Sequence, residues 1–528
     1  MNRRRFIGAG LASLGAACGA VPALRSSNAP SRVALADVRR LIVERTDPIA
    51  GRCRYVADLG ARQVPQPILI ARRGESFDAL IENALPQPTT VHFHGLTLSQ
   101  AQDGAGFDPI APGARKHLRF EVKNRSGLYW FHPHPHGFTA EQVHAGLAGL
   151  LVVTDDDDDA LDAALALAPG NRLALAVADA RVSGGVIRPY APSVEDCLHG
   201  WVGNRALVNG RLDAQWTVAP GWVRLQILNA CNARGLLLGF KNLERGAQEG
   251  REGAGLVPFH LLGTDGGLLA APRELERAFL YTGERIDIGI DVRGRRALAA
   301  VSLEFDPRHH AHGAAPRHRH PARERYAPLT GETVCESASS AEAQDRVADG
   351  AELPLFALRV DGAPARAAAS PPSKLSALAE AGIAPGAPAR RMRLDFDERA
   401  GFLIDQTPYR IDEAGFTVSR SAREVWEIKN SPVSMPHPMH LHGFGFRVLR
   451  RQGTYGGARR LATEPGARFP TDLGVKDTVV LWPNETVWLA LDFTLPGDAA
   501  FRGAQRFMFH CHNLEHEDGM MMRNFTVA

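Results

Sequence analysis

Four short histidine clusters, two near each end of the chain, constrain the fold more than any other feature of the sequence. More than half of the 20 histidines in this 528-residue chain fall in or beside them. Isolated core histidines do not account for repeated His-x-His units. The clusters are His92-Phe93-His94-Gly95, His132-Pro133-His134-Pro135-His136-Gly137, His437-Pro438-Met439-His440-Leu441-His442-Gly443 and His510-Cys511-His512.

The last cluster, followed by His516 and Met521, gathers soft metal ligands in one short segment. Two histidines, one cysteine thiolate and a weak methionine thioether are the ligand set of a blue-copper electron-transfer centre. In an extended strand, neighbouring side chains point to opposite faces, and the next residue but one returns to the same face. Cys511 is therefore predicted to face one metal site, while His510 and His512 face a second site behind it.

With all four motifs in this order, the chain resembles the multicopper oxidase family, of the bacterial laccase and cuprous-oxidase type. The similarity extends to the segments Gly146-Leu147-Ala148-Gly149-Leu150 and Gly263-Thr264-Asp265-Gly266-Gly267. It covers most of the chain beyond residue 40 and is weakest over residues 306–390. The resemblance implies an enzyme that oxidises a small phenolic or metal-ion donor one electron at a time and reduces dioxygen to water.

The resemblance also implies four copper ions: one type 1, one type 2 and two type 3. The type 1 ligands are His437, Cys511 and His516, with Met521, the fifth residue after His516, in the axial position. Because a thioether donates weakly to the oxidised metal, we expect a modest potential and easily oxidised donors.

Eight histidines form the trinuclear cluster according to the same resemblance. His136 continues the alternation of the second motif, but the family pattern makes it a non-ligand near the metal. The type 2 copper is assigned to His92 and His440, and the type 3 pair to His94, His132, His134, His442, His510 and His512.

Two carboxylates match family positions that deliver protons to bound oxygen. Asp103 lies eleven residues after His92, and Glu517 directly follows His516. A carboxylate beside the cluster can relay protons as a general acid or base. For each of them, a surface salt bridge is the alternative interpretation.

The fold class predicted is all-β, with three consecutive cupredoxin-like Greek-key sandwich domains. A chain of this length forms three domains of about 120 to 150 residues. Strand-like runs separated by turn signals are typical of β-sandwiches. Such runs occur at 67–71, 118–122, 149–153, 223–229, 285–291, 424–428 and 485–491.

The domains are expected at residues 35–155, 165–305 and 391–528, with a His/Ala/Pro-rich linker at 306–390. The acidic run Asp155 to Asp159 is interpreted as a solvated linker at the first boundary. The middle domain has no His-x-His unit, so we expect it to be architectural. The metal ions would then join the first and third domains.

A second histidine-rich tract, residues 308–320, lies in the expected linker. Tracts of this kind can bind copper or zinc weakly. A flexible polar loop is the alternative.

Residues 1–30 have the pattern of a signal peptide of the twin-arginine type. Arg3-Arg4-Arg5-Phe6-Ile7 precedes an apolar stretch too short to span a membrane. A periplasmic or other extracytoplasmic location and the twin-arginine export machinery as a partner follow from this interpretation, with a basic tail as the alternative. Cys18 follows a poor lipobox, so lipidation is not expected. An oxidising compartment would permit disulfides among Cys53, Cys197, Cys231 and Cys335, and their pairing stays open.

The formal charge of +3 is almost neutral for this size, so no nucleic-acid partner is expected. We expect a monomer. Two other functions stay open. A copper-tolerance protein could act mainly as a cuprous oxidase or as a copper-sequestering protein. A copper-less structural relative is disfavoured, because every expected ligand is present.

Overall fold

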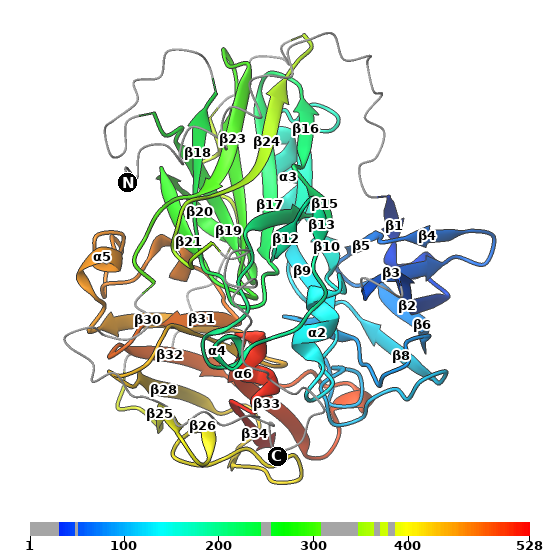
Figure 1. The fold of residues 1–528 in the computed structure, drawn as a ribbon, viewed down its shortest axis with the longest axis vertical. Helices are drawn as coiled ribbons and strands as arrows, with labels where there is room; N and C mark the ends of the chain where they lie inside the picture. The colour runs from blue at the N-terminus through cyan, green and yellow to red at the C-terminus, as the bar shows by residue number, and fades with distance from the viewer. Residues whose placement is uncertain (1–30, 48–50, 244–254, 308–346, 364–369, 378–385) are drawn as a thin grey trace.

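The computed structural model describes residues 31–47, 51–243, 255–307, 347–363, 370–377 and 386–528. The expected signal peptide and the tract at 308–320 therefore lie outside the described residues. Strands dominate, and Figure 1 shows three bodies: one blue to cyan, one green and one yellow to red. The prediction of an all-β fold is confirmed, and each predicted run coincides with a strand.

The first body consists of two five-stranded sheets packed face to face. Their facing side chains, such as Phe77, Phe93 and Leu151, form one buried core. Along β6 buried and more exposed positions alternate, as the period of two in a strand requires. The sheet orders are β1 (Arg32–Ala34), β5 (Ile68–Arg72), β10 (Gly149–Thr154), β9 (Gly127–His132), β7 (His92–His94), and β4 (Gln63–Pro65), β3 (Arg52–Asp58), β2 (Arg40–Asp47), β6 (Ser76–Asn83), β8 (Arg115–Glu121).

The second body pairs a seven-stranded sheet with a five-stranded sheet around its own core. Strand β17 is buried along its whole length, because the core covers one face, and the first body and helix α3 (Asp156–Ala164) cover the other. The orders are β15 (Arg211–Leu212), β14 (Arg205–Val208), β11 (Arg172–Ala180), β17 (Trp222–Asn229), β22 (Arg285–Asp291), β19 (Phe259–Thr264), β20 (Gly267–Leu275), and β16 (Gln215–Val218), β24 (Leu353–Val360), β23 (Ala297–Ser302), β18 (Leu236–Asn242), β21 (Arg277–Leu280). A hairpin, β12 (Val182–Ser183) and β13 (Val186–Ile187), projects beside them.

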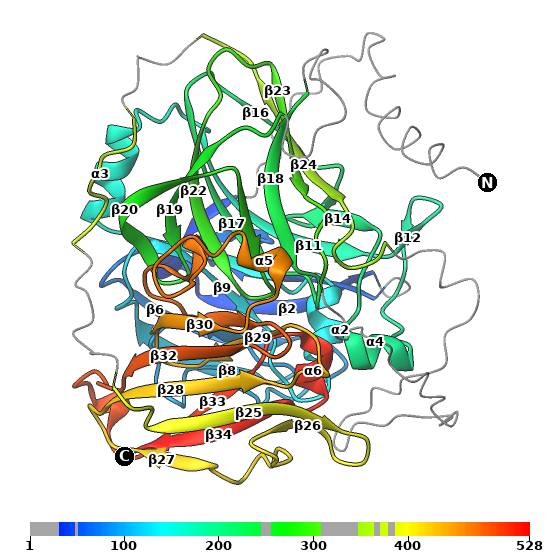
Figure 2. The ribbon, with the colours of Figure 1, turned by 90° about the vertical axis from the view of Figure 1, so that its left-hand side faces the viewer.

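The third body is again a pair of five-stranded sheets around one core, which includes Trp426 and Phe509. The orders are β26 (Gly401–Ile404), β25 (Arg390–Asp397), β28 (Arg423–Asn430), β32 (Thr486–Asp492), β30 (Phe446–Gln452), and β27 (Phe416–Val418), β34 (Met522–Val527), β33 (Gln505–Cys511), β29 (His437–Leu441), β31 (Thr478–Leu481). In Figures 1 and 2 the red end of this body, with β33 and the helix after it, lies against the cyan part of the first body.

Short helices connect these sheets. Two of them, α2 and α6, pack against each other through Ala140, Val143 and Leu514 and so join the two ends of the chain. The helices are α2 (Thr139–His144), α3 (Asp156–Ala164), α4 (Val194–His199), α5 (Gly456–Arg459) and α6 (Leu514–Asp518), with single 3₁₀ turns at Leu35–Asp37, Pro470–Asp472 and Ala499–Phe501. No helix of the described ranges is both long and apolar enough to cross a membrane.

The interpretation of Asp155 to Asp159 as a solvated linker is wrong. Asp155 caps helix α3, accepting a hydrogen bond from the Asp158 amide at 3.1 Å. Asp158 is fully buried and pairs with Arg172 at 2.6 Å and Arg224 at 2.8 Å. Acidic residues at a helix N-terminus interact favourably with the helix dipole. The run therefore begins a helix that is anchored to the second body.

The expected linker at 306–390 also contains structure that the sequence analysis missed. Its residues Leu353–Val360 form β24, which pairs with β23 and β16 and completes a sheet of the second body. Cys197 is disulfide-bonded, whereas Cys53, Cys231 and Cys511 are free thiols.

Candidate metal centre

The histidine motifs lie on paired strands whose register brings the histidines together. In the first body β7 and β9 are antiparallel, with His92 opposite His132. In the third body β29 and β33 are antiparallel, with His440 opposite His510. A slip of one residue in either pair would turn a histidine to the other face. The two strand pairs meet where the first and last parts of the chain pack together.

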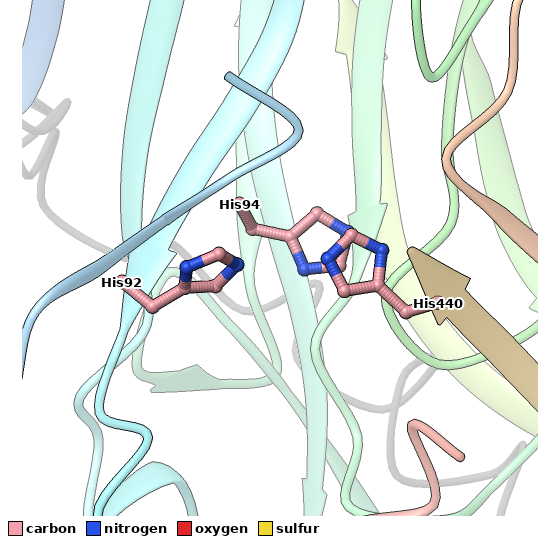
Figure 3. Close-up of side chains that lie close together, drawn as sticks. All are labelled: His92, His94 and His440. Carbon is pink, nitrogen blue, oxygen red and sulfur yellow. The ribbon is translucent and has the colours of Figure 1, made fainter. Parts of the chain in front are cut away.

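Eight buried histidines form three groups in which one ring nitrogen from each member lies within 4.8 Å of the others. Figure 3 shows one group, in which His92 and His94 come from the start of the chain and His440 from the opposite side. The rings of His94 and His440 stack with their centroids 3.7 Å apart. The groups are His92, His94 and His440; His94, His132 and His512; and His134, His442 and His510.

Four of these rings are fixed by hydrogen bonds from Nδ1 to backbone carbonyl oxygens. The opposite nitrogen, Nε2, then points into the cluster, and in His92, His132 and His440 it is buried without a hydrogen-bond partner in the described structure. A buried nitrogen with no partner is costly unless something binds it, and metal-binding histidines commonly donate their other N–H in this way. The four bonds are His92 to Asp103 at 2.7 Å, His132 to Pro133 at 2.8 Å, His440 to Asp477 at 2.9 Å and His510 to Cys511 at 3.0 Å.

Burial keeps the imidazoles of His132, His442 and His510 neutral by lowering their pKa. It lowers the pKa of His132 and His510 well below the ordinary value, and the neighbouring histidines lower it further. The pKa of His442 falls to about 3, again mainly because of burial. Neutral imidazole is the form that binds a metal. The residues present therefore fit a group of copper ions.

A second site lies on the other face of β33. The Cys511 thiol sulfur is 3.5 Å from His437 Nδ1 and 3.7 Å from His516 Nδ1, and all three residues are buried. As alternation along the strand predicts, the residues on either side of Cys511 do not belong to this site. His510 and His512 belong to two of the histidine groups. Burial raises the pKa of the Cys511 thiol, so a metal is needed to hold it as a thiolate.

Met521 lies beside this sulfur site. Its amide donates to the His516 carbonyl at 2.8 Å, and its own carbonyl accepts from the Cys511 amide at 3.0 Å. Its side chain belongs to the same buried core as Cys511, whereas those of Met520 and Met522 pack in a separate cluster. Of the three consecutive methionines, Met521 is thus the one on the side of Cys511.

The two predicted carboxylates are buried against the histidine groups and are not in surface salt bridges. Asp103 Oδ2 accepts from His442 Nδ1 at 2.7 Å. Burial raises its pKa, but the attraction of His442 and His92 outweighs burial, and the net pKa is below the ordinary value.

The pKa of Glu517 is shifted in the opposite direction. Its carboxylate oxygens lie 3.4 Å from His134 Nε2 and 3.4 Å from His510 Nδ1. Burial, and then repulsion from Asp518, raises its pKa well above the ordinary value. Two carboxyl groups whose pKa values are pushed apart suit opposite roles in proton transfer.

Sequence reasoning missed several residues that hold the candidate ligands. Ser434 Oγ lies 2.9 Å from His437 Nε2, and the Leu198 carbonyl lies 3.1 Å from His516 Nε2. Asp477 Oδ1 lies 3.0 Å from His94 Nε2. None of the three belongs to a histidine motif, and a backbone carbonyl leaves no trace in a sequence. His136 joins none of the groups found among the described residues, and its ring packs against Tyr409.

Comparisons with known proteins find multicopper oxidases among the sequence relatives and the solved structures that this chain resembles. Two multicopper oxidase family profiles match residues 57–158 and 383–528. The chain is 27% identical over 466 residues to the multicopper oxidase mco of Staphylococcus haemolyticus, covering 88% of this chain and 82% of that protein. It is 25% identical to the cell division protein FtsP of Xenorhabdus nematophila, covering 86% and 81%. The crystal structure of the McoA multicopper oxidase of Aquifex aeolicus superposes with a TM-score of 0.73 at 27% identity, covering 95% of this chain and 98% of that one.

Fold and site together define a protein of cupredoxin-like sandwiches in which buried histidine groups, spaced so that they could hold metal ions, lie between its two ends. The chain belongs to the multicopper oxidase family and is an oxidoreductase with copper as its cofactor.

Copper should stabilise the folded chain measurably, because the buried ligand groups exist only in the native state. A ligand present at a hundred times its Kd adds about 2.7 kcal/mol to the free energy of unfolding. We expect the thermal unfolding midpoint to rise on adding copper to copper-free protein and to fall again with a chelator. Magnesium is the control, since imidazole and thiolate are poor ligands for it. Equal midpoints with and without copper would contradict the site.

Proposed function

We propose that this protein oxidises a small donor one electron at a time and reduces dioxygen to water with four copper ions. The observation that carries this proposal is the arrangement around Cys511. Its sulfur belongs to one ligand group, and the residues on both sides of it, His510 and His512, belong to two others. A few covalent bonds thus connect the place where an electron enters to the place where four electrons are used.

Each ligand group has a proposed role. His437, Cys511 and His516, with Met521 as the axial ligand, would hold the type 1 copper, and His92 and His440 the type 2 copper. Bound copper supplies one-electron redox chemistry and affinity for dioxygen. The type 3 pair would be held by His94, His132 and His512 and by His134, His442 and His510, a division that the spacing of their nitrogens supports.

The two buried carboxylates would move the protons that oxygen reduction consumes. Glu517, with its raised pKa, can carry a proton beside His134 and His510. Asp103, which its lowered pKa keeps ionised, holds His442 through Nδ1, so its role would be to orient this ring and to pass protons on without retaining them. Both act next to the place where oxygen would bind.

The surroundings of the sulfur site favour an organic donor. The Phe402 ring packs on His516 with centroids 4.2 Å apart, and Phe396, which is 42% exposed, packs on Phe402. Val433, next to Ser434, is 78% exposed. Apolar side chains at the surface beside the site suit an aromatic ring better than a bare metal ion. We therefore favour a phenolic donor over cuprous or ferrous ion.

Cys511→Ser tests the redox role directly. A hydroxyl cannot supply the thiolate on which blue copper depends. The variant should lose the intense blue absorption and about one copper per chain, and oxygen uptake with a phenol should fall to background. Cys231→Ser, which changes a buried free cysteine outside the ligand groups, is the matched control and should stay blue. Native protein that is colourless after copper loading would contradict the proposal.

Glu517→Gln tests proton delivery. The amide keeps the size of the side chain but cannot carry a proton, and loss of general acid catalysis typically slows a reaction about 10²- to 10⁴-fold. We expect slower oxygen uptake at unchanged copper content and blue absorption. Unchanged turnover would exclude this role for Glu517.

We further propose that the protein is exported through the twin-arginine machinery, supported by Arg3-Arg4-Arg5 before an apolar stretch. It would then act as an extracytoplasmic monomer without a nucleic-acid partner. Replacing the three arginines with lysine should retain the full-length chain in the cytoplasm, as measured by cell fractionation. Export that is unaffected by this change would argue against the route.

A further inference from the structure

We propose that Asp477, held in place by Arg285 of the second body, positions His94 and selects the ring nitrogen that it presents to the copper cluster. The inference rests on the proposed role of His94 as a ligand. It gives the middle of the chain, which contributes no ligand, a part in the metal site.

The contacts form a continuous buried chain. Asp477 Oδ1 accepts from His94 Nε2 at 3.0 Å and from Arg285 Nη1 at 2.7 Å, while Oδ2 accepts from Arg285 Nη2 at 2.5 Å. His94 and Arg285 are fully buried and Asp477 is 4% exposed. A two-pronged arginine–carboxylate pair fixes the plane of the carboxylate as well as its position. The imidazole of His94 therefore meets a rigid acceptor.

This acceptor determines the tautomer of His94. A carboxylate paired with arginine only accepts hydrogen bonds. Thr478 Oγ1, 3.2 Å from the same nitrogen, donates its own proton to Asp477 Oδ1 at 2.9 Å. The proton of a neutral His94 must therefore lie on Nε2. Its Nδ1 then carries the lone pair, and this nitrogen is buried without a hydrogen-bond partner in the described structure. His92, His132 and His440 have the reverse arrangement, with Nδ1 bonded to a carbonyl and Nε2 without a partner. His94 is thus turned to present the other nitrogen.

Asp477 also holds the ring that stacks on His94. Its backbone carbonyl accepts from His440 Nδ1 at 2.9 Å. One residue therefore orients two proposed ligands, one from each end of the chain, whose rings overlap in Figure 3. Movement of Asp477 would change both ligands together.

Arg285 cannot turn away from Asp477, because its other donors are engaged as well. The guanidinium also donates to the carbonyls of Leu128 at 3.1 Å, Gly283 at 3.0 Å and Asp265 at 3.0 Å. Leu128 belongs to β9 of the first body, and Arg285 begins β22 of the second. A single side chain therefore links all three bodies directly behind the histidine groups.

A buried ion pair that merely stabilises the interface is the competing explanation, and the chain offers a matched control. Arg451 also forms a two-pronged contact with Asp472, through Nε and Nη2 at 2.7 Å each, and its Nη1 donates to a second carboxylate, Glu485, at 2.9 Å. Asp265 is the corresponding second carboxylate for Arg285, at 3.7 Å. Asp472 contacts no histidine in any interaction of the described structure. Asp477→Asn and Asp472→Asn therefore remove the same charge from comparable pairs.

The first test compares the copper content of the two variants with that of the native protein after dialysis against graded chelator. Loss of a group that orients a metal ligand typically weakens metal binding about 10- to 100-fold. In Asp477→Asn we expect trinuclear copper to be lost at about 10- to 100-fold lower chelator, with an altered type 2 electron paramagnetic resonance signal and unchanged blue absorption. Asp472→Asn should retain copper like the native protein even where its unfolding midpoint falls. Equal copper retention in both variants would overturn the proposal.

The second test reads the tautomer itself, independently of turnover. Nitrogen-15 spectra of histidine-labelled, copper-free full-length protein distinguish a protonated Nε2 from a protonated Nδ1. We expect His94 to carry its proton on Nε2 in the native chain and in Asp472→Asn, and to lose this preference in Asp477→Asn. If His94 of the native chain carried its proton on Nδ1, the proposal that Asp477 selects its ring nitrogen would be refuted. If His94 had the expected tautomer but the copper-loaded protein had no oxidase activity, the proposed function would be refuted and the role of Asp477 would stand.

Discussion

Eight imidazoles packed into one water-excluded volume are the constraint on which the rest of the structure depends. Each ring has lost its hydration, and several ring nitrogens, including His92 Nε2 and both nitrogens of His512, have no hydrogen-bond partner within the described residues. Such burial opposes folding unless a metal compensates for it. The core on the other face of each strand pair, with Phe93 and Phe509, supplies the apolar burial that holds the rings in this arrangement.

The strands, and the face of the strand to which each ligand points, could be predicted, because side chains alternate between the two faces of a strand with a period of two residues. Alternation along the strand predicts Cys511 on one face and His510 on the other, and the two residues belong to different ligand groups in the structure. The acidic run at Asp155 was misinterpreted because charge alone does not separate a solvated segment from a capped helix start whose Asp158 meets buried arginines. Strand β24 was missed because residues 303–352 separate it from β23, the strand before it, and its other partner, β16, lies earlier still in the chain.

The supporting groups of the site were the least predictable part. Asp477 is one of many aspartates in the sequence and becomes distinctive only when Arg285, 192 residues away, packs against it. The expectation that the middle body is only architectural rested on its lack of His-x-His units. Ligand motifs reveal which residues bind a metal, whereas the groups that aim them are recruited through tertiary contacts and have no fixed spacing.

Six of the eight rings are held in one of two ways. His92, His132, His440 and His510 donate to backbone carbonyls, which no substitution of a side chain removes directly. His442 and His94 depend on carboxylate side chains, Asp103 and Asp477, which a single substitution can alter. Because a charged acceptor also makes an imidazole a stronger donor to a metal, these two rings are where sequence changes can tune the cluster without changing its ligands.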